Sequence, residues 1–241
     1  MKTEKPLIST ILPVFNGARY IQQAIESILE QDHEPMEIIV VDDGSVDDTR
    51  KVVQRFGSRV TYVYQENAGI AITMNHGVKL SAGSLLAFLD SDDYWLPGKI
   101  IKQRAALEQD PSLDMVFGHV RQFFSPELEE ELKKKYTFPS GSVPGRNSGV
   151  MLIRREAFFR VGWFDPQWKK GIFNDWYMRA VEKGLRMEVL PDVLYMRRIH
   201  DANHGILSRS HYGDYARMLK AALDRKRQSG KGNQNGQEAE N

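Results

Sequence analysis

The sequence contains no cysteine, which excludes disulfide bonds and metal sites built on thiolates. It also lacks a long hydrophobic run, since no segment approaches the ~20 apolar residues that span a bilayer. The first ten residues, MKTEKPLIST, lack the apolar core of a secretory signal peptide. We therefore expect a cytoplasmic protein, and peripheral contact with the inner membrane through a partner or a lipid-linked substrate stays open.

An excess of charge of either sign is also missing. The 33 basic and 32 acidic residues leave a formal net charge of +1, so we expect no nucleic-acid partner. The 241 residues, 41% of them hydrophobic, are enough for one large domain, which we place at residues 1–227. Residues 228–241 have Ala239 as their only apolar residue, so we predict a disordered tail there.

Strands and helices are expected to alternate in the first half of the chain. Short apolar runs are typical of strands buried on both faces, and the segments between them carry apolar residues at helical spacing. The expected strands are residues 7–14, 37–41, 60–64 and 85–89, and the expected helices are 18–30, 47–56, 70–80 and 97–109. This alternation predicts an α/β fold with a mainly parallel sheet flanked by helices.

The second half of the chain predicts a smaller, mixed region. The charged segment 127–136 fits a helix or a loop, and the glycine- and proline-rich segment 139–147 predicts a mobile loop. The expected strands are residues 115–124, 148–153, 186–190 and 193–198, and the expected helices are 155–161, 176–183 and 212–227.

An acidic cluster follows the fourth expected strand, in the stretch LLAFLDSDDYW. Its carboxylates, Asp90, Asp92 and Asp93, fall just past the strand's carboxyl end, where open α/β sheets place ligands. Three like charges this close favour a bound cation, and oxygen ligands suit Mg²⁺ or Mn²⁺. The alternative is an acidic loop that caps the helix beginning near Pro97.

Two other turns belong to the same edge of the predicted sheet. In the turn Asp42–Ser45, a carboxylate could accept a hydrogen bond from a nucleobase or ribose, or the turn could simply cap the next helix through Ser45 or Asp47. In the segment PVFN, Phe15 could stack on a flat ring, although the residue alone favours a place in the core.

Two residues late in the chain carry chemical groups with more than one reading. His200 follows Arg197 and Arg198, and its imidazole could be a second ligand to an ion held by Asp92, with the arginines meeting a diphosphate. The alternative is an ordinary histidine in the core or on the surface. Asp175, in FNDWYMRA, fits a helix N-cap or a general base.

Taken together, these segments make the chain resemble the family 2 glycosyltransferases, inverting enzymes with the GT-A fold. The resemblance runs from about Ser9 to His200, and the order and spacing of the motifs are more specific than any one of them. The motifs are ILPVFNGARYIQQAIESILEQ, EIIVVDDGSVDDT, NHGVKLSAGSLLAFLDSDDYWLPGKI, SGVMLIRREAF, NDW and RRIHDAN.

The resemblance implies a role for each matching residue. Phe15 and Asp43 would hold the base of a nucleotide-sugar, with Pro13 contributing backbone. Asp90-Ser91-Asp92 would be the DXD motif, with Asp92 and His200 as ligands of Mn²⁺ or Mg²⁺. Asp90 and Asp93 would help with the donor's ribose, its sugar or the metal, Arg198 would be a further donor-binding residue, and Asp175 would be the general base.

The implied function is transfer of a sugar from a UDP- or dTDP-type donor to an acceptor hydroxyl. Residues 1–112 would bind the donor, and residues 113–227 would bind a glycan, lipid-linked or protein acceptor. Two positions depart from the family pattern. Asn174 stands where the family has glutamate before the base, and Met74 stands where the family often has arginine, so a phosphate role there would fall to Arg197 or Arg198.

Three other functions fit parts of this pattern. A nucleotidyltransferase typically carries a glycine-rich basic loop after its first strand, which PVFNGARY does not resemble. A haloacid-dehalogenase-type phosphatase also has an apolar run followed by DXD. In those enzymes the motif lies near the N-terminus, and a threonine or valine commonly stands four positions after the first aspartate, where this chain has Tyr94. An inactive, glycosyltransferase-like scaffold is the third, and the retained Asp92, Asp175 and His200 argue against it.

Overall fold

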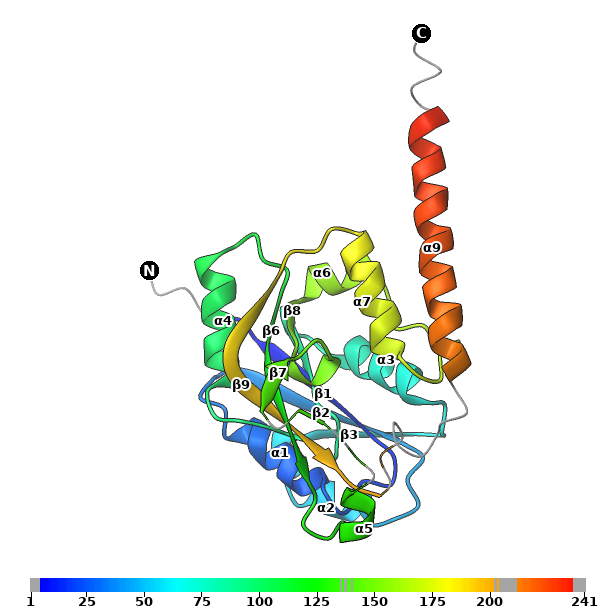
Figure 1. Ribbon diagram of the computed structural model, residues 1–241. Helices are drawn as coiled ribbons and strands as arrows, with labels where there is room; N and C mark the ends of the chain where they lie inside the picture. The colour runs from blue at the N-terminus through cyan, green and yellow to red at the C-terminus, as the bar shows by residue number, and fades with distance from the viewer. Residues whose placement is uncertain are drawn as a thin grey trace.

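The computed structural model describes residues 5–134, 136, 138–139, 141–201, 203 and 212–235, and the side chains among them except those of 212 and 228–235. These residues form one sheet with the strand order β3-β2-β1-β4-β8-β6-β9-β5, and β7 pairs with β6 (Figure 1). The strands are β1 (Ile8–Val14), β2 (Met36–Asp43), β3 (Thr61–Gln65), β4 (Leu85–Phe88), β5 (Tyr94–Trp95), β6 (Met115–Phe124), β7 (Ser142–Pro144), β8 (Leu152–Arg154) and β9 (Met187–Ile199).

The first four strands are parallel, as the alternation of strand and helix predicted. β1 lies between β2 and β4, with Ile8 opposite Met36 on one side and Leu85 on the other. Every residue of β1 is buried because helices cover both faces of this half of the sheet. The predicted α/β fold is therefore confirmed, with a parallel first half and a mixed second half in which β8 runs antiparallel to both β4 and β6.

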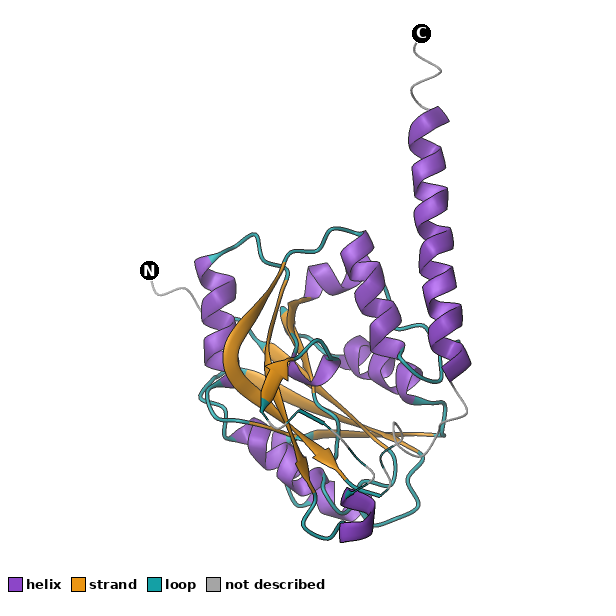
Figure 2. Ribbon diagram, in the orientation of Figure 1, coloured by secondary structure: helices purple, strands orange, loops and turns teal. Residues whose placement is uncertain are grey.

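Figure 2 shows helices on both sides of the sheet. α1 and α2 lie on one face, and α3, α6 and α7 lie on the other (Figure 1). Packing is close where α3 crosses β1, since a Cβ added to Gly77 would lie 2.4 Å from Cγ2 of Ile11. The helices are α1 (Ile21–Leu29), α2 (Thr49–Gln54), α3 (Ile70–Leu80), α4 (Lys99–Gln109), α5 (Glu130–Lys133), α6 (Arg155–Val161), α7 (Ile172–Glu182) and α9 (Tyr212–Asn235).

The second half differs from the sequence prediction at several boundaries. The two strands expected at 186–190 and 193–198 form the single strand β9, and the predicted mobile loop at 139–147 contains the short strand β7. A 3-10 turn at residues 148–150 precedes β8, where a longer strand was expected. β5 was not expected at all, because two residues carry too little pattern.

Two helices also differ from the prediction. α7 begins at Ile172 with Gly171 as its N-cap, so Asp175 lies inside the first turn and is not the N-cap residue. α9 continues to Asn235, beyond the predicted helix end at Arg227, and residues 236–241 of the predicted disordered tail lie outside the described residues. In the described part of the chain, no helix combines the length and the hydropathy needed to cross a bilayer.

Candidate functional site

The turns after β1 and β2 are joined directly to each other. The backbone N–H of Asn16 donates to Ser45 Oγ (2.8 Å), and the N–H of Val46 donates to Asn16 Oδ1 (2.9 Å). The N–H of Ala18 donates to a carboxylate oxygen of Asp47 (3.0 Å). Ser45 and Asp47 therefore link the two turns. Asp47 also accepts a hydrogen bond from the backbone N–H of Thr49, the first residue of α2, at 3.0 Å, so it contributes to the start of that helix, whose N-cap residue is Asp48.

The acidic turn after β4 packs against the first of these turns. A Cβ added to Gly17 would lie 2.4 Å from Cγ2 of Val14 and 3.1 Å from Oγ of Ser91. Glycine at position 17 is what allows the β1 turn to approach the Asp90–Asp93 segment this closely. The acidic turn does not cap the next helix, because α4 has Gly98 as its N-cap and no side-chain cap bond. All three turns thus meet at the carboxyl ends of β1, β2 and β4.

Phe15 and Pro13 occupy different environments at this edge. The Phe15 ring is 46% exposed, so the core position that the residue alone favoured is wrong. An exposed ring beside three polar turns can stack on a planar ligand. Pro13 is buried in β1 after the last pairing of that strand with β4, which is Ile11 opposite Phe88, so its missing N–H leaves no bond to β4 unmade.

Asp43 is buried at the end of β2 and organises the loop that follows β3. Its Oδ1 accepts hydrogen bonds from Gln65 Nε2 (2.7 Å) and the Ala68 N–H (2.9 Å), and its Oδ2 accepts one from the Gly69 N–H (2.9 Å). One lone pair of Oδ2 is not used by these three bonds. Asp43 can therefore fix the loop and still accept a hydrogen bond from a ligand.

Asp92 and His200 lie together, although 108 residues separate them in the chain. His200 Nε2 is 3.0 Å from Asp92 Oδ2, and the Asn203 side-chain amide donates to the same oxygen at 3.0 Å. Two ligand atoms at right angles, each about 2.1 Å from one octahedral ion, lie about 3.0 Å apart. The two side chains thus have the donor atoms and spacing of neighbouring metal ligands.

The remaining donors for an ion would have to come from elsewhere. No group of three or more His, Cys, Asp or Glu side chains suited to a metal occurs among the described residues. Mg²⁺ and similar ions are commonly held by one or two carboxylates, with waters and substrate phosphates completing the shell. The pair Asp92 and His200 fits that kind of site, in which the substrate supplies part of the coordination.

The pKa values of Asp90 and Asp93 are raised, because burial and the other carboxylates both disfavour their charged forms. Burial and the nearby Asp92 carboxylate raise the pKa of Asp90 to about 6, and the Arg197 guanidinium opposes that rise. Burial raises the pKa of Asp93 well above its usual value, with Asp92 and Asp90 adding to the effect. A cation bound at this turn would relieve the repulsion among the three groups.

Arg198 holds the acidic turn in place and is only 5% exposed. Its Nε donates to the backbone oxygen of Asp92 (2.9 Å), and one terminal nitrogen donates to the Gln23 side chain. Its guanidinium carbon lies 4.6 Å from the ring centroid of Tyr20 and 4.8 Å from that of Phe123. Arg198 therefore lies between two aromatic rings and is already bonded to protein groups.

Asp175 is paired with arginines of α7 and α9. It is 2% exposed, and one carboxylate oxygen accepts a hydrogen bond from Arg179 Nε at 2.8 Å. The other oxygen lies 3.7 Å from a terminal nitrogen of Arg225, which belongs to α9. No contact found in the described residues joins Asp175 to Asp92 or His200. The contacts found for Asp175 thus run to α7 and α9, whereas those of the other predicted residues join the turns at the carboxyl ends of the strands.

Three further residues contribute to the site and were missed or undervalued in the sequence. The Tyr195 hydroxyl donates to Asp93, and Asn203 holds both Asp92 and the backbone N–H of His200 (2.6 Å). The ring of Tyr20 lies 4.9 Å from that of His200. Tyr195 gave no sequence signal because a tyrosine in an apolar strand is ordinary, whereas Asn203 stood in the motif RRIHDAN.

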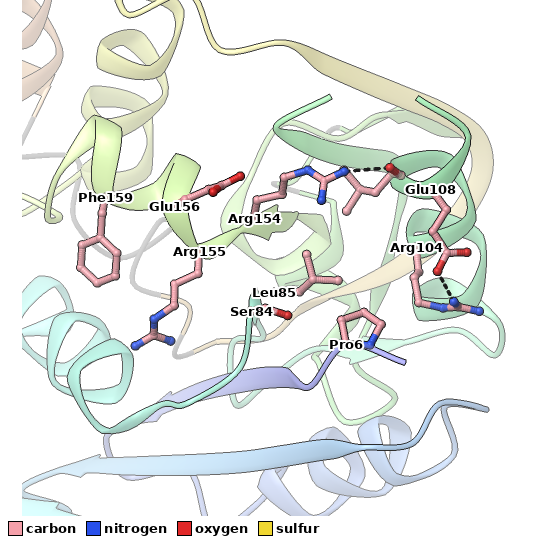
Figure 3. Close-up of a pocket in the computed structure, with 10 residues that line it drawn as sticks. Pro6, Ser84, Leu85, Arg104, Glu108, Arg154, Arg155, Glu156 and Phe159 are labelled. Atoms are coloured by element: carbon pink, nitrogen blue, oxygen red, sulfur yellow. Dashed lines mark hydrogen bonds and ion pairs between the residues drawn. The ribbon is translucent and has the colours of Figure 1, made fainter. Parts of the chain in front are cut away.

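A hollow of about 440 Å³ lies at the amino ends of β1 and β4, opposite the acidic turns (Figure 3). Its arginines are largely occupied by the backbone, since Arg155 donates to the carbonyl oxygens of Val78, Ser81 and Gly83. Figure 3 shows Arg104 bonded to Glu108 on the far wall. This hollow is remote from the acidic turns and contains no cluster of free catalytic groups.

Comparison with known sequences identifies related proteins. The profile described as Glycosyl transferase family 2 matches residues 9–174. An uncharacterized glycosyltransferase of Rickettsia typhi is 32% identical over 218 residues, which cover 83% of this chain and 66% of that protein. The chain spans about two thirds of this curated relative's length and less of several others.

Comparison with solved structures shows the same fold. S. aureus TarS 1–349 in complex with UDP-GlcNAc matches with a TM-score of 0.72 at 21% identity, covering 89% of this chain and 65% of that one. The mannosyltransferase PcManGT from Pyrobaculum calidifontis, in complex with GDP-Man and Mn²⁺, matches with a TM-score of 0.64 at 21% identity, covering 92% and 63%. The fold is the GT-A fold of these glycosyltransferases.

Proposed function

Because the chain belongs to glycosyl transferase family 2, we propose that it transfers a sugar from a nucleotide-diphosphate donor to an acceptor hydroxyl with inversion at the anomeric carbon. The observation that carries the proposal is the approach of Asp92 and His200 to 3.0 Å, beside the turns that hold Phe15 and Asp43. Phe15 and Asp43 are the groups suited to the base of a nucleotide, and Asp92 and His200 are the groups suited to a metal ion at its diphosphate. A UDP- or dTDP-sugar is the proposed donor class.

The chain's own residues would position the donor. The exposed Phe15 ring would stack on the base, Asp43 would accept a hydrogen bond from it, and Pro13, near the end of β1, would contribute backbone. Asp90 and Asp93 would face the ribose and sugar. A divalent ion, Mn²⁺ or Mg²⁺, bound to Asp92 and His200 would supply the positive charge that stabilises the departing diphosphate.

We propose Asp175 as the group that takes the proton from the acceptor hydroxyl. Arg179 Nε lies 2.8 Å from one Asp175 oxygen and an Arg225 terminal nitrogen lies 3.7 Å from the other, so the carboxylate is held in a fixed position, as a general base must be. Since Asp175 is buried beneath Arg225, an acceptor can reach it only after that arginine and its helix move. The ion pairs also support a second role, in which Asp175 holds α9 against α7.

Donor binding can be tested by thermal unfolding in the presence of UDP, dTDP and GDP, each with Mn²⁺, with Mg²⁺ or with EDTA. A nucleotide at 100 times its Kd stabilises the native state by about 2.7 kcal/mol, which raises the Tm of a chain of this size by roughly 5–10 °C. We expect that rise for one or more nucleotides with metal, and its loss in EDTA and in Asp92→Ala.

Donor hydrolysis by the same samples separates an enzyme from a binding scaffold. Slow, metal-dependent release of the nucleotide diphosphate from a UDP-sugar supports the transferase, whereas a thermal shift without any release would identify a scaffold. The absence of a shift with all three nucleotides at millimolar concentration would refute donor binding altogether.

A further inference from the structure

We infer that Arg197 is the residue that binds the diphosphate of the donor, whereas Arg198 serves to position the acidic turn. The inference rests on the proposed function, since it names the residue that meets one part of the proposed donor. It decides between the two arginines that the sequence left open for a phosphate role, and it moves the donor contact from Arg198, which the resemblance implied, to Arg197.

The two arginines face opposite sides of the sheet because they are neighbours on the strand β9. Arg198 points toward Tyr20 and Phe123, where its guanidinium group is enclosed. Arg197 therefore points to the other face, which it shares with Tyr195, two residues earlier. Two residues of strand span about 6.6 Å, so Arg197 lies that much nearer the end of β9 than Tyr195.

Tyr195 shows what this second face looks toward. Its hydroxyl donates to the Asp93 carboxylate, and its ring lies so close to Gly149 that an added Cβ would come within 2.5 Å of it. The ring therefore has the acidic turn at its tip and the backbone of residue 149 along its side. Arg197 comes later on the same face of the strand, and its guanidinium group is close enough to act on the Asp90 carboxylate of the acidic turn.

The negative charges of Asp90, Asp92 and Asp93 would be offset by a positively charged side chain that can also contact a ligand. Arg197 is close enough to Asp90 for their charges to interact. Within the described part of the chain, its guanidinium group makes no hydrogen bond or ion pair, and it is half-buried. The Asp90, Asp92 and Asp93 carboxylates would repel a diphosphate, so an arginine beside them offsets charge that one divalent ion cannot balance alone.

A guanidinium group suits this task because of its shape. Its planar fork can donate two parallel hydrogen bonds to two phosphate oxygens, which a lysine ammonium cannot do. Arg198 cannot adopt that arrangement without leaving Asp92 and Gln23, which would release the turn that carries the metal ligand. The two arginines take different roles because neighbouring residues of a strand place their side chains on opposite faces of the sheet.

The test compares a ligand that contains the diphosphate with one that lacks it. Titration calorimetry with Mn²⁺ would measure the Kd of UDP and of uridine for the wild type and for Arg197→Gln, with GDP and guanosine used if GDP gives the larger thermal shift. We expect Arg197→Gln to weaken UDP binding by about 10- to 100-fold, the effect of losing hydrogen bonds to a charged group, and to leave uridine binding unchanged.

Two further variants keep the outcome interpretable. Arg197→Lys retains the charge and loses the fork, so its loss of UDP affinity should be smaller than that of Arg197→Gln. Arg198→Gln should lower the Tm and weaken the thermal shift given by Mn²⁺ alone, which a residue that only binds the diphosphate would not do.

Each remaining result counts against the inference. UDP affinity within twofold of the wild type in Arg197→Gln would overturn it, as would equal losses for UDP and uridine. A wild type that binds no nucleoside diphosphate would overturn the proposed function as well. If Arg197→Gln does not fold, Arg197→Lys decides, because unchanged UDP binding in that variant would exclude bidentate contact.

Discussion

Lys99 illustrates how far a single residue can depart from its ordinary chemistry. It is fully buried, its Nζ donates to Gln103 Oε1 (2.8 Å), and it lies 4.0 Å from the ring centroid of Trp95. Burial lowers the pKa of its ammonium group well below the usual 10.5. The fold thus retains a lysine that can release its proton in the core.

The free energy of unfolding should therefore rise with pH in a way that depends on Lys99. The unfolded chain keeps the lysine proton up to about pH 10.4, while the folded chain loses it earlier, so the unfolded state binds more protons between the two pKa values. Within that window the difference between wild type and Lys99→Met should grow by about 1.4 kcal/mol per pH unit.

Urea unfolding at a series of pH values from 7 to 10 would measure this difference. Lys102→Met is the matched control, because Lys102 is an exposed lysine on the same helix. The same pH dependence in wild type and Lys99→Met would show that Lys99 keeps its proton in the folded state.

At the scale of single residues, the sequence was informative where neighbours in the chain do the work. The acidic turns after β2 and β4 could be predicted because each follows directly on its strand. The exposure of Phe15 and the bond from Tyr195 to Asp93 could not, since both depend on contacts between distant segments. Tyr195 and Asp93 are 102 residues apart.

At the scale of elements, the α7–α9 junction is where sequence and structure differ most. The Asn174-Asp175 pair is a typical start signal for a helix, yet α7 begins at Ile172. The actual N-cap, Gly171, has a φ of 69°, and an added Cβ would lie 2.8 Å from Cε of Met218. The contact with α9 therefore selects this start, and local sequence does not contain that information.

Arg225 connects the same two helices and can be used to test the base. Its Nε and one terminal nitrogen donate to Glu182 at 2.8 and 3.0 Å, and another terminal nitrogen lies 3.7 Å from Asp175. Arg225→Ala should loosen α9, so trypsin should cleave the helix faster. If Asp175 is the base, uncovering it should also raise the rate of donor hydrolysis.

Asp175→Asn is the complementary variant. It should reduce sugar transfer by about 10²- to 10⁴-fold, the usual contribution of a general base, while the thermal shift with nucleotide stays nearly unchanged. Full activity in Asp175→Asn, with faster cleavage of α9, would assign this carboxylate to the helix junction and remove it from the reaction. Arg217→Ala controls for loss of charge on α9, since Arg217 pairs with Asp214 instead.

β9 shows why another element was predicted in pieces. Pro191 lies in the middle of this strand and suggests a break. In the structure, Phe117 of β6 pairs with Val189, and His119 pairs with Val193, so four residues of β9 match two of β6. This irregularity accommodates the proline without ending the strand. Pairing with a partner strand decides continuity, and the partner is distant in the sequence.

At the scale of the whole molecule, two edges of one sheet carry different surfaces. The acidic turns lie at the carboxyl ends of the parallel strands, and the 440 Å³ hollow lies at the other edge (Figure 3). Fold class and the place of the acidic edge could be predicted because strand order along the chain implies them. The reversed strand β8, which joins the two halves, could not be predicted from periodicity.

Hydrogen exchange would test which edge binds the donor. With UDP and Mn²⁺, we expect slower exchange at residues 13–18, 43–46, 90–95 and 197–200, and no change at residues 84–85 and 154–159. Added uridine without metal should protect the first two segments only. Protection confined to residues 84–85 and 154–159 would place the nucleotide in the hollow and contradict the proposed site.

The clamp formed by Arg198 has a consequence for protein synthesis. The three carboxylates of the β4 turn leave the ribosome before the residues that hold them. Arg198 follows Asp92 by 106 residues, and His200 follows it by 108. A nascent chain therefore lacks an assembled form of the proposed donor site. Under the proposed function, activity would begin only after translation has passed His200, so shorter, abandoned products would not consume donor.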